Sequence, residues 1–281
     1  MRSAHYVTIA ASVALIVVLY FGGNLVAPVR ADKAIIESEN SNSNSTKYLV
    51  FDSILKSSKL QLSKSEVDEI SRIEKKLNTI HDSVQMAPVF LQLSKIWETH
   101  NEKKISAYYE GISAKFENSE KNLTFAARIF LQLMHQEDNS DIRLWEARQA
   151  VELAEQSFKI DSNFEETKLV LATGYVEGVG ETMKGVQLLL GLVKNNPNNI
   201  TANLLLGKMS VQSGQIDKAI SRFETVLKQD SLNKDAYYYL AQAYKGKGNK
   251  QKAIELLETG KRIVNDKEFS EQADQEINLL K

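Results

Sequence analysis

The stretch ITANLLLGKMSVQSGQIDKAISRFETVLKQDSLN (residues 200–233) is followed at once by KDAYYYLAQAYKGKGNKQKAIELLETGKRIVNDK (residues 234–267). Gly214 recurs as Gly248 and Ala219 as Ala253, each 34 positions later. Leu206 and Ile220 recur at the same spacing. A period of this length is typical of a repeat made of two helices, helix A and helix B, joined by a short turn. The duplication therefore predicts stacked helical hairpins.

Each copy contains the small and large apolar residues that two packed helices need. Small residues let the helices approach closely, and large ones fill the space between them. A glycine between the helices supplies the positive φ that a helix end often requires. The first copy has Leu206, Gly207, Gly214, Ala219, Phe223 and Val226; the second has Leu240, Ala241, Tyr244, Gly248, Ala253, Leu257 and Gly260.

Repeat length, turn glycine and packing positions together resemble the tetratricopeptide repeat family. The sequence departs from that pattern at Ser210, where the family usually has a large aromatic residue, and at Ser231, where it usually has proline. The resemblance covers residues 88–267 and is strongest over 165–267. It implies an all-α, right-handed superhelical solenoid of about five helix-turn-helix repeats.

Three less regular units precede the two clear copies. Residues 88–121 carry Leu91, Leu93 and Trp97 in a first helix and Ala107, Gly111 and Ala114 in a second. Residues 122–164 predict helices over 125–134 and 142–160. In residues 165–199, Gly178 and Gly180 are interpreted as a turn with one inserted residue. A terminal helix over 268–281, with Phe269, Ala273, Ile277 and Leu280 at helical spacing, should cap the last repeat.

The first 30 residues predict a membrane anchor. Tyr6 to Ala27 is an uncharged run of 22 residues, long enough to cross the hydrocarbon core as a helix. A cleaved signal peptide is the alternative, because Val29-Arg30-Ala31 resembles a cleavage site. The numbers of basic residues on the two sides of the run are nearly equal, so their bias gives little preference for either orientation in the membrane. The short N-terminal tail favours a cytoplasmic N-terminus with exported, periplasmic repeats. A cytoplasmic location of the repeats stays open.

Between anchor and repeats, residues 31–47 predict a flexible linker, since Ser38 to Thr46 contains no apolar residue. Residues 48–87 predict a helical segment, in which Ser63 and Glu66 form a capping box before a helix over 63–86. Its apolar stripe comprises Val67, Ile70, Ile73, Leu77, Ile80 and Val84. The stripe predicts either a helix that packs on the first repeat or a short coiled coil that dimerises the protein.

Composition argues against most chemistry. The formal net charge is -1, so no overall basic field favours nucleic acid. Cysteine is absent, which excludes thiolate catalysis and cysteine-bound metals. The four histidines, at positions 5, 81, 100 and 135, show no metal-binding spacing, and the glycine-rich GYVEGVGETMKG lacks the features of a phosphate loop. We expect no enzyme activity, no cofactor and no metal.

The family resemblance implies a concave groove, lined by helix A, that holds a segment of another protein. We therefore expect a membrane-tethered interaction scaffold, in layout similar to bacterial envelope proteins that carry an anchor before such repeats. A structural oligomer and, less favoured, a helical-repeat nucleic-acid binder are the alternatives. The apolar groove positions could instead pack helix on helix. By their positions within the repeat, the groove residues that the family resemblance implies are Glu166, Leu169, Thr173, Val176, Thr201, Leu204, Lys208, Val211, Asp235, Tyr238, Gln242 and Lys245.

Overall fold

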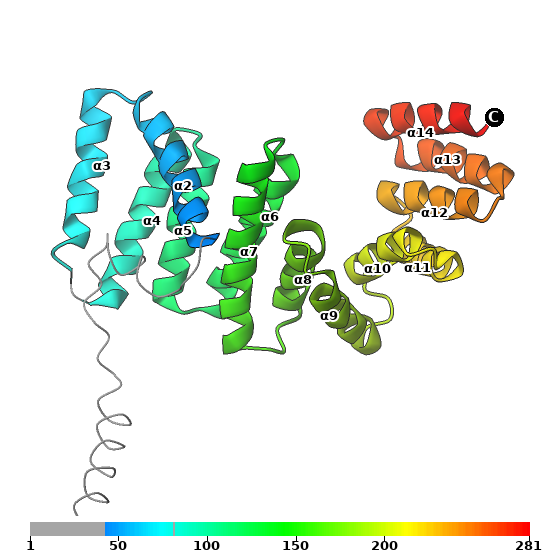
Figure 1. Ribbon diagram of the computed structural model, residues 1–281, viewed down its shortest axis with the longest axis horizontal. Coiled ribbons are helices and arrows are strands. Elements are labelled where there is room, and N and C mark those ends of the chain that lie inside the picture. The colour runs from blue at the N-terminus through cyan, green and yellow to red at the C-terminus, as the bar shows by residue number, and fades with distance from the viewer. Residues whose placement is uncertain (1–42, 81) are drawn as a thin grey trace, which may run out of the picture. The chain divides into compact units, whose positions relative to one another are not determined.

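The computed structural model describes residues 43–80 and 82–281, with only the backbone for 43–49 (Figure 1). The described residues divide into two compact units, one that ends at Leu93 and one from Ser94 to Lys281, which are considered separately below. The described residues form thirteen α-helices, α2 to α14, and one π-helical segment, η1. The predicted membrane helix at Tyr6 to Ala27 lies outside them. Among the helices that the structure does describe, none is long and apolar enough to span a bilayer.

In the first unit, helices α2 (Ser43–Lys59) and α3 (Lys64–Leu77) are joined by a short turn. The predicted capping box is confirmed: the Ser63 side chain accepts from the Glu66 amide, and the Ser63 amide donates to Glu66 Oε2 at 2.7 Å. An ion pair of 2.9 Å between Lys59 Nζ and Glu74 Oε1 ties α2 to α3. Residues 43–47 begin α2, so the helix starts inside the predicted linker, whose residues 31–42 lie outside the described part. Serine and asparagine are favoured at helix starts, so the polar residues at the end of the predicted linker can begin a helix.

The prediction of one helix over 63–86 is wrong, because α3 ends at Leu77. Thr79 Oγ1 donates to the Lys76 carbonyl at 2.8 Å, and the next helix starts at Ser83 with Asp82 Oδ1 accepting from the Val84 amide. Polar side chains thus terminate one helix and begin another. Ile70, Ile73 and Leu77 are buried, whereas Val84 is 72% exposed. The part of the stripe that lies in α3 is therefore covered within the chain, and α3 alone offers too few heptads for a stable coiled coil.

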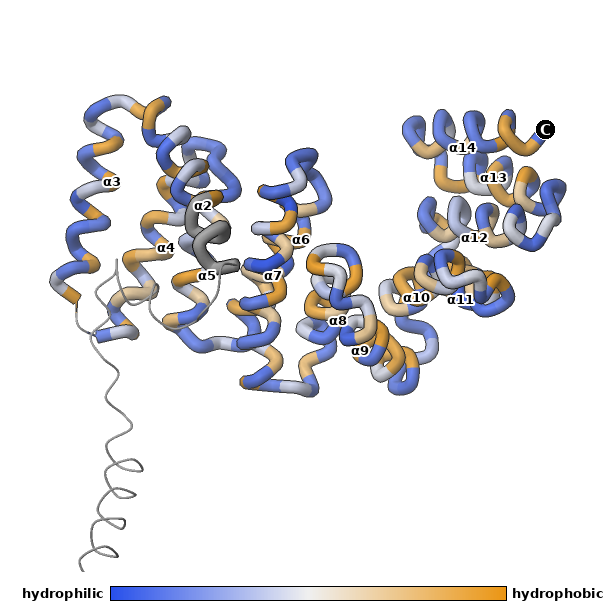
Figure 2. The backbone as a smooth tube through the Cα atoms, viewed as in Figure 1, coloured by the Kyte–Doolittle hydropathy of each residue, from blue (hydrophilic) through white to orange (hydrophobic). Residues whose placement is uncertain are grey.

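Helix α4 (Ser83–Thr99) crosses the division between the units and starts five residues before the predicted repeat boundary at Pro88. It is followed by alternating helices whose connecting turns are mostly polar (Figure 2). The helices follow in the order that the predicted hairpins require, and the two helices of each of the four later hairpins pack on each other. Their helices are α5 (Lys103–Glu117), α6 (Glu120–Gln136), α7 (Ser140–Ile160), α8 (Glu165–Thr173), α9 (Thr182–Asn195), α10 (Ile200–Gln212), α11 (Ile216–Gln229), α12 (Lys234–Gly246), α13 (Lys250–Val264) and α14 (Lys267–Leu280).

The core of the second unit follows the repeat positions. Gly214 and Gly248 end α10 and α12 with φ of 72° and 81°, a region that only glycine enters at low cost. Ala219 and Phe223 are fully buried in a cluster with Leu240. The predicted cap is confirmed as well, because one side of α14 packs onto α13. That side consists of Phe269, Ala273, Ile277 and Leu280, all buried.

The inserted residue of the third hairpin takes the form of a π-helix, η1 (Gly174–Gly178), which continues α8 without a break. Gly180 follows with φ of 75°. η1 packs tightly on α7, since a Cβ at Gly174 would lie 2.8 Å from Val151 Cγ2 and one at Gly178 would lie 2.7 Å from Ala147 Cβ. Single-residue insertions are often absorbed as π-turns, frequently near functional sites.

Candidate interaction surface on the A helices

The first helices of four successive hairpins, α6, α8, α10 and α12, form one candidate surface together with the capping helix α14. α6 packs against α8, and α10 packs against both α8 and α12. The predicted groove residues recur on these helices at i, i+3 and i+7, which places those of each helix on one side. This surface is called the A-helix face below.

Ion pairs link the A helices one to the next. Arg128 of α6 lies 2.9 Å from Glu166 of α8, and Lys245 of α12 lies 2.7 Å from Glu276 of α14. Between them, Lys208 of α10 lies 3.4 Å from Asp235 of α12. We call this series the ion-pair ladder. Exposed pairs are each worth only about 0–1 kcal/mol, so the ladder aligns neighbouring helices more than it stabilises them.

Glu177 of η1 adds a further contact to this ladder, between α6 and α10. Its Oε2 lies 2.9 Å from Nε2 of His135 on α6, and its Oε1 lies 3.9 Å from Nζ of Lys208. Partial burial raises the pKa of Glu177, but the hydrogen bond to His135 and the charge of Lys208 outweigh it, so that the pKa is lowered overall. Glu177 is therefore a carboxylate at neutral pH. Beside it lies a polar hollow of about 420 Å³, lined in part by His135, Ser140 and Arg143.

Lys208 differs from its predicted role. We expected an outward-facing cation, but its side chain is only 22% exposed and its ammonium group lies between Glu177 and Asp235. The same ammonium group sits 4.9 Å from the centre of the Tyr239 ring, a cation–π distance. Lys208 is thus engaged by three groups from neighbouring repeats.

Tyr238 and Gln242 lie on the stripe of α12 whose ends, Asp235 and Lys245, belong to the ladder. Both side chains are half-buried, and Tyr238 meets Tyr239 edge to face with ring centres 5.4 Å apart. The stripe of α12 therefore presents an aromatic ring and an amide between two charged ends.

The other predicted groove residues divide into two groups. Thr201 is exposed, and the Thr173 hydroxyl donates to the carbonyl of Leu169 in its own helix at 2.9 Å. The apolar members pack against core clusters, as the alternative interpretation of those positions expected. These are Leu169 and Val176 around α8 and α9, and Leu204 and Val211 around α10 to α12.

Arg128, His135, Glu177 and Glu276 were missed by sequence reasoning. His135 was assigned to a turn, and it lies 42 positions before its partner Glu177. The π-helix shifts the frame at η1, so the 34-residue spacing alone could not pair these residues. A signal existed in the i, i+7 relation of Arg128 and His135, which places both on one side of α6.

Comparison with known proteins finds similarity in the repeat region of the chain. Residues 210–271 match a tetratricopeptide repeat family model. The C-terminal hairpins are similar to tetratricopeptide repeats. The match covers α11 to α13 and the start of α14, where most of the 34-residue identities lie. No curated protein is significantly similar to the chain.

Two solved structures are similar to most of the solenoid. The part of MamA from residue 41 to its end, from Desulfovibrio magneticus RS-1, is 15% identical with a TM-score of 0.51 and covers 64% of this chain and 96% of that one. A thermophilic tetratricopeptide repeat protein from Thermus thermophilus is 15% identical with a TM-score of 0.50 and covers 67% and 97%. At this identity the likeness concerns the fold alone. It extends the assignment of a helical-repeat solenoid beyond the matched family segment.

Proposed function

We propose that the protein is a non-enzymatic, membrane-tethered scaffold that binds a segment of a partner protein on its A-helix face. Tetratricopeptide repeats serve protein–protein interaction through such faces. The observation that carries the proposal is the stripe of α12, where Tyr238 and Gln242 lie between two ion pairs that fix the neighbouring helices. A tyrosine on a rigid helix offers large contact area at low entropic cost.

The charges of this face suggest how a partner segment would be oriented. Glu177 and Asp235 are neutralised by Lys208, and Lys245 is neutralised by Glu276. Arg143, in the hollow beside Glu177, has no ion pair among the described residues. A partner segment would then place its apolar part on Tyr238 and a carboxylate near Arg143.

Tyr238→Ala should reduce recovery of native partners at least tenfold, which corresponds to about 1.4 kcal/mol of binding. The measurement is quantitative affinity capture of the full-length protein, cross-linked in membranes of the native host. Tyr244→Ala is the matched control: Tyr244 is a half-buried tyrosine of the same helix, but its hydroxyl points to Glu224 of α11, away from the A-helix face. Equal losses in both variants, or none in either, would place binding elsewhere.

Lys208 is unsuitable for the same test. Lys208→Glu would bring a third carboxylate next to Glu177 and Asp235, so any loss of binding would be mixed with a loss of stability. Gln242 does not belong to the ladder, and Tyr238 packs on the same C-terminal core cluster as its control Tyr244, so the comparison of the two tyrosines separates a loss of binding from a loss of stability.

The membrane tether is the second part of the proposal and rests on the uncharged run at residues 6–27. Leu232→Cys introduces the only thiol of the chain, at a turn residue that is 61% exposed between α11 and α12. A membrane-impermeant maleimide should label this thiol in intact cells, because the anchor is proposed to export the repeats. Labelling only after lysis would place the repeats in the cytoplasm, and a mature N-terminus at Asp32 would replace the anchor with a cleaved signal.

A further inference from the structure

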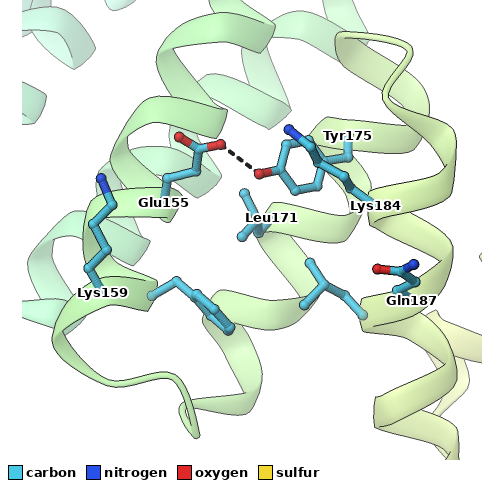
Figure 3. A pocket seen from close by; sticks show the side chains of 8 residues that line it. Glu155, Lys159, Leu171, Tyr175, Lys184 and Gln187 are labelled. Carbon is cyan, nitrogen blue, oxygen red and sulfur yellow. Dashed lines mark hydrogen bonds between the residues drawn. The ribbon is translucent and has the colours of Figure 1, made fainter.

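Helix α9 presents an apolar side to solvent, unlike the second helices of the next two hairpins. Met183 and Leu190 are 70% and 47% exposed, and α9 contains no aspartate or glutamate. Figure 3 shows Lys184 and Gln187 on α9, at the edge of a hollow of about 460 Å³ between α7 and α9. The other two helices expose charges of both signs, which include Asp217, Glu224 and Lys228 on α11 and Glu255, Glu258 and Arg262 on α13.

The outward side of α9 combines a protruding side chain with a matching space. Met183 protrudes, and a Cβ placed at Gly191 would have no heavy atom within 4 Å. Gln187, which is exposed, lies midway between these two residues. When two copies of α9 pack antiparallel about a two-fold axis at Gln187, residue 183 of each copy lies opposite residue 191 of the other. The methionine of each copy then fits the space at the glycine of the other.

Two charged residues at the ends of α9 fit the same arrangement. Lys194 has no ion pair with the side chains that the structure describes. Glu181, at the start of α9, has a side chain that is 46% exposed and pairs with Lys184 of its own chain. With the axis at Gln187, residue 194 of one copy lies opposite residue 180 of the other, next to Glu181. Lys194 of each copy can therefore pair with Glu181 of the other, and the symmetry makes this contact twice.

The parts of the second unit before and after α9 carry opposite net charges. Residues 94–181 contain ten lysines and arginines and sixteen aspartates and glutamates, a net charge of -6. Residues 196–265 contain eleven lysines and arginines and six acidic residues, a net charge of +5. Ion pairs within either part leave these net charges unchanged. A two-fold axis at α9 places the acidic part of each copy beside the basic part of the other, which favours association.

Other arrangements match these charges less well. A partner of one sign would be attracted by one part of the unit and repelled by the other. Residues 266–281, which contain the cap α14, have five acidic and two basic residues. Stacking of copies end to end would therefore bring this acidic end against the acidic part of the next copy. A second copy of the chain, packed side by side and antiparallel, satisfies both parts at once.

We propose that the protein forms a symmetric homodimer through α9 of each copy, with Gln187 at the two-fold axis. Met183 of each copy packs against Gly191 of the other, and Lys194 pairs with Glu181. One helix of 14 residues from each copy buries less than the roughly 1,200 Å² of a stable interface, so the charged parts supply much of the attraction. The affinity is then in the micromolar range, and the protein is largely monomeric in dilute solution. The A-helix face stays free, so dimerisation makes the scaffold bivalent.

Energy transfer between labelled copies measures this association. Full-length protein with Leu232→Cys carries a single thiol at an exposed turn, and separate batches receive a donor dye or an acceptor dye. Mixed in an excess of detergent micelles, the batches should show energy transfer that saturates with protein concentration. Raising the NaCl concentration from about 0.1 M to about 1 M shortens the screening length from about 10 Å to about 3 Å and should weaken the association at least tenfold. Absence of saturable transfer, or transfer that salt does not affect, would contradict the proposal.

Gly191→Gln tests the fit between the two copies of α9. The added side chain points into open space in the single chain, so the melting temperature should not fall. It occupies the space that Met183 of the other copy requires, and the association should therefore weaken at least tenfold. An unchanged affinity would exclude close packing of α9 on α9.

Exchange of charges between the copies gives the decisive result. Lys194→Glu alone and Glu181→Lys alone should each weaken the association at least tenfold, because each variant brings like charges together twice. A mixture of the two variants, one with the donor dye and one with the acceptor dye, should associate as the unsubstituted chains do. In this mixture the two introduced charges face each other, and so do the two native ones. A mixture that associates no better than each variant alone would overturn the antiparallel contact.

The cap α14 offers matched controls for the charge exchange. Lys267→Glu and Glu268→Lys make the same two changes at side chains that are both 91% exposed and lie far along the chain from α9. They should leave the association nearly unchanged, alone or mixed. Tyr238→Ala should also leave it unchanged, which separates the dimer contact from the A-helix face. Energy transfer that survives both Lys194→Glu and Glu181→Lys would place self-association on another surface.

Discussion

Glu146→Gln should stabilise the protein at pH 8 by about 3 kcal/mol and change its stability little at pH 4. Glu146 of α7 is 0% exposed, and neither of its carboxylate oxygens has a hydrogen-bond partner among the described residues. Burial raises the pKa of Glu146 to about 7; the negative charge of Glu137 adds to this, while the positive charge of Lys104 opposes it. The unfolded chain titrates near the ordinary value of 4.5.

The sign follows from these two pKa values. Between pH 4.5 and 7 the folded protein keeps a proton on Glu146 that the unfolded chain releases, so stability falls as the pH rises through this window. Above the window the folded state contains a buried carboxylate, and the full cost is present. Glutamine cannot ionise and avoids this cost. Urea unfolding at pH 4 and pH 8, followed by circular dichroism, measures the difference.

Glu268→Gln is the control for the pH experiment, because the Glu268 side chain is 91% exposed and lies 3.9 Å from Lys234. Its substitution should leave stability nearly unchanged at both pH values. A constant effect of Glu146→Gln across the pH range would show that packing, not ionisation, governs this position.

Gly207→Ala should destabilise the protein by about 1–2 kcal/mol, although alanine is the better helix former by up to about 1 kcal/mol. A Cβ at Gly207 would lie 2.6 Å from Cε1 and 2.8 Å from Cζ of Phe223. That ring is fully buried and also stacks on Tyr239 with ring centres 5.9 Å apart, so it has little space to move. This repeat requires glycine at position 207 because the Phe223 ring occupies the space that a Cβ would need, whereas the next repeat has Ala241 at the equivalent position opposite Leu257.

Gly191→Ala is the matched control, since Gly191 is also a glycine inside a helix but nothing lies within 4 Å of its added Cβ. The same substitution should there stabilise the protein by about 0.5–1 kcal/mol through the lost backbone entropy of glycine. The two variants should therefore shift the urea midpoint in opposite directions. Stabilisation by both would contradict the packing of Phe223 on α10.

The sequence predicted the repeats well where periodicity is strong and poorly where single polar residues decide. The 34-residue identities located the core positions Ala219, Phe223 and Ala253, because packing demands small and large residues at fixed helical spacing. The end of α3 was missed because hydrophobic spacing continues through Ile80 and Val84, while local hydrogen bonds of Thr79 and Asp82 break the helix. Hydrophobic periodicity shows which side of a helix is apolar, but it does not show where the helix ends.

The candidate surfaces were predictable only in part. The frame placed Asp235, Tyr238, Gln242 and Lys245 on one stripe, which the ion pairs at both ends support. It could not foresee that Lys208 would be engaged by Glu177, because that contact joins η1 to α10 across an inserted residue. The buried state of Glu146 was also unforeseen. A glutamate within the helical pattern of α7 suggests an exposed position, and only the packed structure reveals its burial.

The cap α14 has a consequence for assembly. Its apolar residues cover α13, and on its remaining sides Leu279 is the one large apolar residue that is exposed. Lys267, Glu271 and Asp274 lie among its outward residues. A stack of helical hairpins with an open apolar end would add further chains head to tail without limit, as heterologous contacts that never close do. Helix α14 covers the apolar side of α13, so this side of the last hairpin is not available for such a contact.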